Sequence, residues 1–140
     1  MSAHERSVEL AVLAARAAAD KKAKELIALD VSERLVLTDV FLVTSGASER
    51  QVGAIVDGVE EAMHGAGVKA LRKEGVSEGR WVLLDYGDIV VHVQHDEDRE
   101  FYALERLWKD CPVVPLPEDV TRTDRADDDE SGSGGWAERG

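Results

Sequence analysis

Two aspartates that flank a short turn are the first candidates for chemistry in this sequence. Asp85 and Asp88 bracket Tyr86-Gly87, and Asp39 is a possible third carboxylate elsewhere in the chain. Paired carboxylates can hold a metal ion or transfer protons. No nucleophile or lysine stands near this pair in the sequence, so turn acids or contacts with a partner explain it more simply.

The segment Ser45-Gly46-Ala47-Ser48 lies between an expected strand and an expected helix, where backbone N–H groups can bind phosphate. It lacks the Gly-Lys-Ser or Gly-Lys-Thr ending of a Walker loop and does not match the dinucleotide-binding fingerprint. Ser48 and Gln51 fit a capping box, in which each residue satisfies backbone N–H groups at the helix start. We therefore expect helix capping. The alternative is a nucleotidyltransferase-like nucleotide-binding enzyme that uses this segment and a carboxylate pair.

Four histidines and one cysteine could bind a metal or supply a nucleophile. His92 and His95 are three residues apart at a strand end, so they point to opposite faces, while His4 and His64 lie on other elements. Zinc requires ligands that converge. Cys111 follows an expected helix end, where the helix dipole does not favour a thiolate. We predict a packed thiol, no metal site, no cofactor and no catalytic residue.

The composition indicates a small folded protein. The chain has 140 residues, 44% of them hydrophobic and 33% charged, which suits one domain. A single cysteine excludes an internal disulfide, and no apolar run approaches the roughly 20 residues of a membrane span. The first residues do not resemble a secretory signal. We expect a cytoplasmic protein without membrane attachment.

The charge is strongly acidic, with a formal net value of −12. Residues 118–140 contain eight acids and three bases and show no apolar periodicity. This composition predicts an acidic, disordered tail over 118–140 that follows one domain over 1–117. Direct sequence-specific binding to nucleic acid is not expected, because no broad basic surface is available. An acidic surface favours a basic protein partner.

Hydrophobic spacing predicts an α/β fold with a mixed sheet and packed helices. Helices are expected over 4–19, from 48 to a stop at Gly65 or Gly67, and over 96–109. Strands are expected over 25–31 and 35–44, as a short edge strand over 68–71, and twice within 81–94. The three prolines between 112 and 117 suggest an extended arm.

The hairpin within 81–94 divides into two faces. With Tyr86-Gly87 as its loop, Asp85 pairs with Asp88 and side chains alternate between the faces. One face is wholly apolar and is expected to form the core: Val82, Leu84, Ile89, Val91 and Val93. The other face is mixed: Trp81, Leu83, Asp85, Asp88, Val90 and His92.

The mixed face has two interpretations. Two carboxylates opposite one another cost stability unless a partner or a counter-charge answers them, and an aromatic and acidic patch is typical of an interface centre. A helix that covered this face would instead make Trp81 part of the core. The residues alone leave both possibilities open.

Three blocks of sequence carry a family resemblance. The first is Thr38-Asp-Val-Phe-Leu-Val-Thr-Ser-Gly-Ala-Ser-Glu-Arg-Gln-Val52. The second is Glu74-Gly75 with Trp81-Val-Leu-Leu-Asp-Tyr-Gly-Asp-Ile-Val-Val-His-Val93, and the third is Arg99-Glu-Phe-Tyr-Ala-Leu-Glu-Arg-Leu-Trp108. Together they closely resemble the Iojap family, whose bacterial members are the ribosomal silencing factors (RsfS), over roughly residues 5–112.

This resemblance implies a nucleotidyltransferase-like fold without the catalytic acids, and a homodimer. It implies binding to a large-subunit ribosomal protein at the intersubunit face, which would block joining of the small subunit and repress translation under nutrient limitation. We therefore expect a binding protein and not an enzyme. With the hairpin faces, the resemblance suggests these partner contacts: Trp81, Leu83, Asp85, Tyr86, Asp88, Val90, Glu100 and Tyr102.

Overall fold

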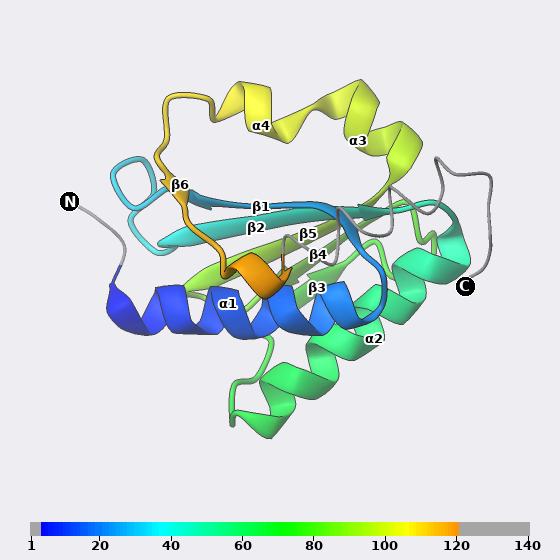
Figure 1. Cartoon of the computed structure of the whole chain (residues 1–140), viewed down its shortest axis with the longest axis horizontal. Coiled ribbons are helices and arrows are strands. Elements are labelled where there is room, and N and C mark those ends of the chain that lie inside the picture. Colours follow the sequence, from blue (N-terminus) through cyan, green and yellow to red (C-terminus); the bar gives the residue numbers. More distant parts are fainter. Residues whose placement is uncertain (1–3, 121–140) are drawn as a thin grey trace.

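A mixed sheet with helices on both faces forms the centre of the molecule, and the expected α/β fold is confirmed (Figure 1). The computed structural model describes residues 4–120, and only the backbone of Phe101, Tyr102 and Glu105. The strand order is β3-β4-β5-β2-β1-β6, with β2 and β5 parallel and the other neighbours antiparallel. The strands are β1 (Lys24–Asp30), β2 (Val40–Gly46), β3 (Arg72–Glu74), β4 (Trp81–Asp85), β5 (Ile89–His95) and β6 (Val113–Val114).

The helices cover opposite faces of this sheet. The long helices α1 (Glu5–Asp20) and α2 (Glu49–Gly65) pack below it in Figure 1, and the short helices α3 (Asp96–Tyr102) and α4 (Leu104–Leu107) lie above it. The first core lies between the sheet and helices α1 and α2, and it includes Leu42, Ile55 and Leu84. A smaller second core lies on the other face of the sheet, between the sheet and helices α3 and α4. No helix of the described residues is long and apolar enough to cross a membrane.

Helix capping explains the start of α2, as expected. The Ser48 hydroxyl accepts a hydrogen bond from the Gln51 backbone N–H at 3.1 Å. Gln51 Oε1 in turn accepts from the Ala47 N–H at 2.8 Å, one residue earlier than a standard capping box. After the helix ends, Gly67 adopts the left-handed conformation with φ of 78°, which a glycine adopts without strain.

Two expected strands differ in their bounds. The strand expected from residue 35 begins only at Val40, because Leu35 N–H bonds back to the Val31 carbonyl in a turn. In the loop that follows, Val36 is 97% exposed, so the apolar run does not indicate burial there. The edge strand expected over 68–71 lies instead at Arg72–Glu74.

The C-terminal part of the fold also departs from expectation. The single helix expected over 96–109 is broken at Ala103, which has φ of 48° and separates α3 from α4. The expected extended arm contributes β6, which pairs with β1. Val120 is 2% exposed and packs in the first core, so the packed region includes residues beyond 117. The expected disordered tail falls, from residue 121 onward, outside the described residues.

Candidate functional site

The β4–β5 hairpin has the expected faces but a different register. Asp85 pairs with Val90 instead of Asp88, and the Tyr86 N–H donates to the Ile89 carbonyl at 2.9 Å. The expected pairs are therefore wrong by two residues. Because side chains alternate with a period of two, this shift leaves each side chain within the two strands on its expected face.

The apolar face of the hairpin is part of the first core, as expected. Its five residues are at most 1% exposed: Val82, Leu84, Ile89, Val91 and Val93. The expectation that the carboxylates of Asp85 and Asp88 face one another across the hairpin is wrong. Asp88 lies exposed in the turn, while Asp85 Oδ1 accepts from the Gly87 N–H at 2.9 Å. Arg72 Nη2 stands 3.7 Å from Asp85 Oδ2 and supplies a counter-charge.

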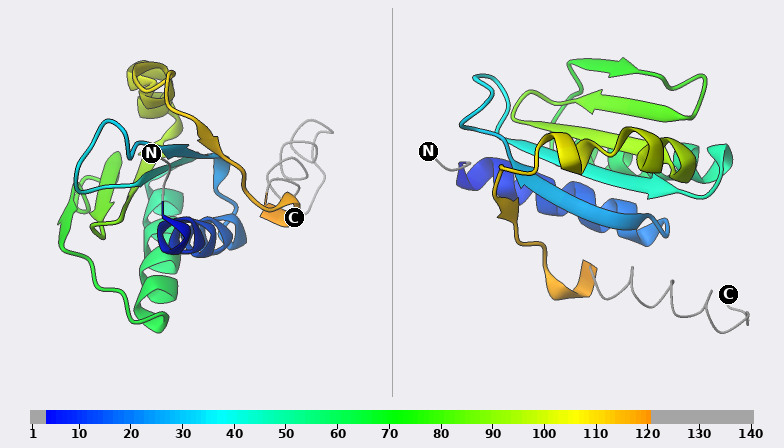
Figure 2. Two further views of the ribbon diagram at one scale, coloured as in Figure 1. Left: turned by 90° about the vertical axis from the view of Figure 1, so that its left-hand side faces the viewer. Right: turned by 90° about the horizontal axis from the view of Figure 1, so that it is seen from above.

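The mixed face is divided between a covered part and an open part. Val90 and His92 on β5 are 7% and 6% exposed beneath α3 and α4. Trp81, Leu83 and Asp85 on β4 are only half-buried. In Figure 2, the view from above shows α3 and α4 lying over the β5, β2 and β1 side, with β3 and β4 left uncovered. The mixed face is therefore covered by helices on β5 and open on the adjacent strand β4.

Trp81, Leu83 and Asp85 form a partly exposed row along one strand, here called the β4 strip. Alternate residues of a strand share a face, so the three side chains stand in one row. Trp81 and Leu83 also pack against the second core. The strip offers an aromatic ring, an aliphatic side chain and a carboxylate on a rigid strand.

His92 holds the buried edge of the Trp81 indole in place. The Trp81 Nε1–H donates to His92 Nδ1 at 3.2 Å, and the ring of Phe41 meets the imidazole edge-on with centroids 5.0 Å apart. Burial lowers the pKa of His92 to about 4. The imidazole is therefore neutral at physiological pH and remains a hydrogen-bond acceptor.

This burial of His92 predicts acid sensitivity. An unfolded imidazole has a pKa of about 6.5, so below that pH the unfolded chain binds a proton that the folded chain does not. Stability is therefore full above pH 6.5 and decreases toward pH 4, by about 2 kcal/mol between pH 7.5 and pH 5. Urea unfolding of wild type and His92→Leu at both pH values isolates this loss, since other groups titrate in both proteins. An equal loss in the two proteins would contradict the assignment.

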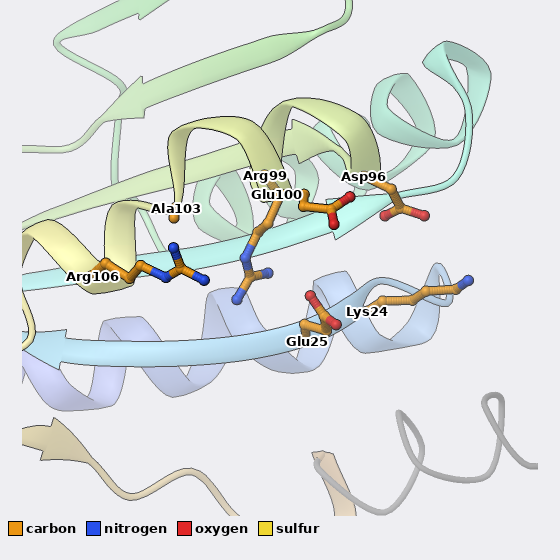
Figure 3. Close-up of a pocket in the computed structure, with 7 residues that line it drawn as sticks. All are labelled: Lys24, Glu25, Asp96, Arg99, Glu100, Ala103 and Arg106. Carbon is orange, nitrogen blue, oxygen red and sulfur yellow. The ribbon is translucent and has the colours of Figure 1, made fainter.

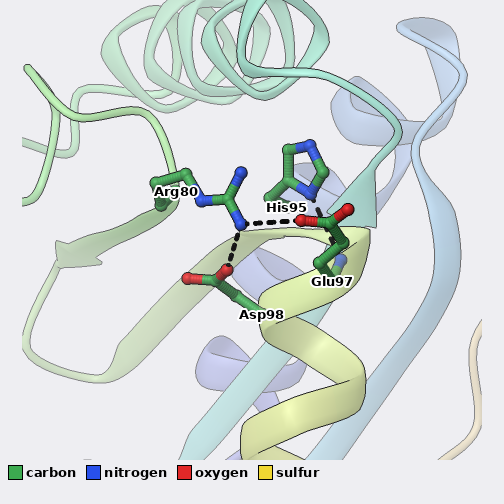
Figure 4. A network of polar contacts seen from close by, with 4 residues as sticks. All are labelled: Arg80, His95, Glu97 and Asp98. Atoms are coloured by element: carbon green, nitrogen blue, oxygen red, sulfur yellow. Dashed lines mark hydrogen bonds and ion pairs between the residues drawn. The ribbon is translucent and has the colours of Figure 1, made fainter.

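An ion-pair network joins the start of β4 to the start of α3 (Figure 4). Arg80 Nη2 donates to Glu97 Oε1 at 3.1 Å and to Asp98 Oδ1 at 2.7 Å, and both bonds raise the pKa of Arg80. His95 Nδ1 accepts from the Glu97 backbone N–H at 3.2 Å. No local pattern in the sequence indicates this network, because the partners of Arg80 are 17 and 18 residues away. It anchors α3 beside the β4 strip.

The other predicted contact residues lie elsewhere. Tyr86 is 7% exposed in the first core, where burial and then the charge of Glu60 raise its pKa to about 12. Glu100 is exposed on α3, and the side chain of Tyr102 lies outside the described residues. Of the eight predicted contacts, Val90 and Tyr86 are therefore buried and can only support a binding surface from behind.

Glu100 lines a polar pocket of about 490 Å³ on the side of α3 away from β4 (Figure 3). Both acidic and basic side chains line it, and Arg99 points toward β1. The complete lining is Lys24, Glu25, Asp96, Arg99, Glu100, Ala103 and Arg106. Strands β5 and β2 separate this pocket from the β4 strip.

The other residues considered for chemistry are the serines of segment 45–48 and Cys111, and each has a role in packing or capping. Ser45 is 1% exposed, and Ser48 is used as the cap of α2. Cys111 is 8% exposed and packs in the second core. Within residues 4–120, apart from the side chains left undescribed, no three His, Cys, Asp or Glu residues are grouped to hold a metal.

Known proteins are similar to this chain in sequence and in fold. The family described as "Ribosomal silencing factor during starvation" (RsfS) matches residues 4–138. The ribosomal silencing factor RsfS of Halalkalibacterium halodurans is 44% identical over 108 residues, which cover 77% of this chain and 92% of that protein. The chloroplastic protein Iojap of Zea mays is 30% identical over 118 residues, covering 82% of this chain and 50% of that protein.

A solved structure agrees with the sequence matches. A crystal structure of a Bacillus halodurans protein superposes with a TM-score of 0.69 at 42% identity, covering 77% of this chain and 98% of that one. By sequence and by structure, this chain belongs to the RsfS family of ribosomal silencing factors.

Proposed function

We propose that this protein binds the large ribosomal subunit in the cytoplasm, through a ribosomal protein at the intersubunit face. Its bulk there blocks joining of the small subunit and represses translation under nutrient limitation. The protein acts by occupying a surface and not by catalysis. Membership of the family supports this proposal, and the β4 strip is the observation that carries it.

The β4 strip has the chemistry of an interface centre. Aromatic anchors in the middle of an interface contribute much of the binding energy, and the surrounding polar residues exclude water. Trp81 and Leu83 supply the apolar contact, and Asp85 with the exposed Asp88 supplies acidic groups at its end. The net charge of −12 steers the protein toward a basic partner.

The proposed contact surface consists of the β4 strip and Asp88, extended by Glu100 and Tyr102 of α3. A standard protein interface buries about 1,600 Å² in total, more than the strip alone can supply. We propose that the partner also contacts α3, which Arg80 ties to the start of β4 and on whose far side Glu100 lies. We also propose that the free protein forms homodimers.

A subunit-joining experiment tests this function. Large subunits are incubated with the protein, small subunits are added, and joined ribosomes are separated by sedimentation. We expect the joined fraction to fall in proportion to the protein added. An unchanged joined fraction, with the protein bound to large subunits, would exclude the steric mechanism while leaving the binding intact.

A further inference from the structure

His92 has a position that stability alone does not explain. It lies on β5 directly across from Leu83, is 6% exposed, and contacts the rings of Trp81 and Phe41. Since Nδ1 accepts the hydrogen bond from Trp81, the proton of the neutral imidazole is on Nε2. Nε2 is buried and has no hydrogen-bond partner among the described residues.

A buried donor without a partner destabilises a folded protein. An aliphatic side chain at this position would fill the space among apolar neighbours without that penalty. The benefit of the imidazole is its bond to Trp81, which aligns the indole of a half-buried residue. Phe41 holds the imidazole in turn, because its ring packs edge-on against it.

We propose that His92 is a positioning residue that fixes the indole of Trp81 for contact with the partner, a role that rests on the proposed function. A side chain already held in one orientation loses less conformational entropy on binding. Trp81 therefore meets its partner as a rigid surface, supported by β5 from behind.

The same hydrogen bond defines what Trp81 presents to the partner. Indole has one polar group, the Nε1–H, and His92 accepts its hydrogen bond inside the protein. The exposed part of the ring is then hydrocarbon. The partner surface that receives it is an apolar recess and not a hydrogen-bond acceptor.

Two substitutions of similar shape separate positioning from simple packing. His92→Asn retains an acceptor, because its Oδ1 can occupy the place of Nδ1, whereas His92→Leu has none. The affinity for purified large subunits is measured by co-sedimentation, and the exchange rate of the Trp81 indole N–H by NMR of ¹⁵N-labelled protein. A Trp81→Phe variant identifies that resonance among the three tryptophans.

We expect His92→Leu to stay folded, with a thermal midpoint at least that of wild type. Its indole N–H should exchange faster, and its affinity should fall about fivefold, in the range that ordering one side chain contributes. His92→Asn should remain within about twofold of wild type in affinity, because the acceptor is retained.

Wild-type affinity in a folded His92→Leu would overturn the positioning role. Equal losses in both variants would also overturn it, since they would indicate packing alone. If wild type itself does not bind large subunits, the proposed function fails. The claim about the indole is then decided by exchange, and an unchanged rate in His92→Leu overturns it.

Discussion

Replacing Trp81 with alanine should weaken binding to the isolated large ribosomal subunit by at least about tenfold. Trp81 is the largest side chain of the β4 strip, and it is both partly exposed and held in place by His92. Truncation removes an aromatic anchor from the centre of the proposed interface. The measurement is co-sedimentation of the variant with purified large subunits over a range of concentrations.

Val113→Ala is the matched control for this experiment. Val113 is 61% exposed on β6, which lies at the opposite edge of the sheet from β3 and β4. Its truncation also removes exposed apolar surface, but far from the β4 strip, so we expect wild-type affinity. Equal binding by a folded Trp81→Ala variant and wild type would remove the strip as the contact site.

Gly75→Ala should destabilise the fold by at least about 2 kcal/mol and disturb the β4 strip at the same time. Gly75 has φ of 78°, and a methyl group there would overlap the backbone carbonyl of Trp81. Relief requires movement of the turn before β4 or of the strand itself. Urea unfolding measures the loss, and co-sedimentation with large subunits should show weaker binding.

Gly53→Ala provides the same substitution in an open place. Gly53 lies on the exposed side of α2, and a methyl group there would meet nothing within 4 Å. Alanine has the higher helix propensity, so this variant should gain up to about 1 kcal/mol. Similar free energies of unfolding for the two variants would contradict the close approach of Gly75 to Trp81.

The faces of the hairpin could be predicted from the sequence, but its register could not. Alternation assigns Val82 and Ile89 to one face whichever pairing with the same parity forms. The pairing depends on how the turn closes, and here the Tyr86 N–H bonds to the Ile89 carbonyl. A tight two-residue loop at Tyr86-Gly87 was the simpler expectation from the sequence.

The division of the mixed face depends on contacts that are distant in the sequence. Whether Trp81 is covered is decided by the position of α3, which Arg80 ties to β4 through Glu97 and Asp98. The break at Ala103 is equally hard to foresee, because alanine is the best helix former. Ala103 nevertheless adopts the left-handed conformation, with φ of 48°.

The candidate contact residues came from alternation and from family resemblance together. Alternation along β4 identified Trp81, Leu83 and Asp85 as one row, and the structure places them in a partly exposed row. Tyr86 is a candidate because of the resemblance and Val90 because of alternation, yet each is 7% exposed. Neither alternation nor the resemblance shows which strand α3 and α4 cover, so neither separates a residue that can touch a partner from one that supports the surface from behind.

The most direct test of the account is separate co-sedimentation of the wild-type protein with purified large and small ribosomal subunits. The proposed function predicts saturable binding to the large subunit and none to the small subunit, with loss of the former in Trp81→Ala. Equal binding to both subunits, or binding to neither, would contradict it.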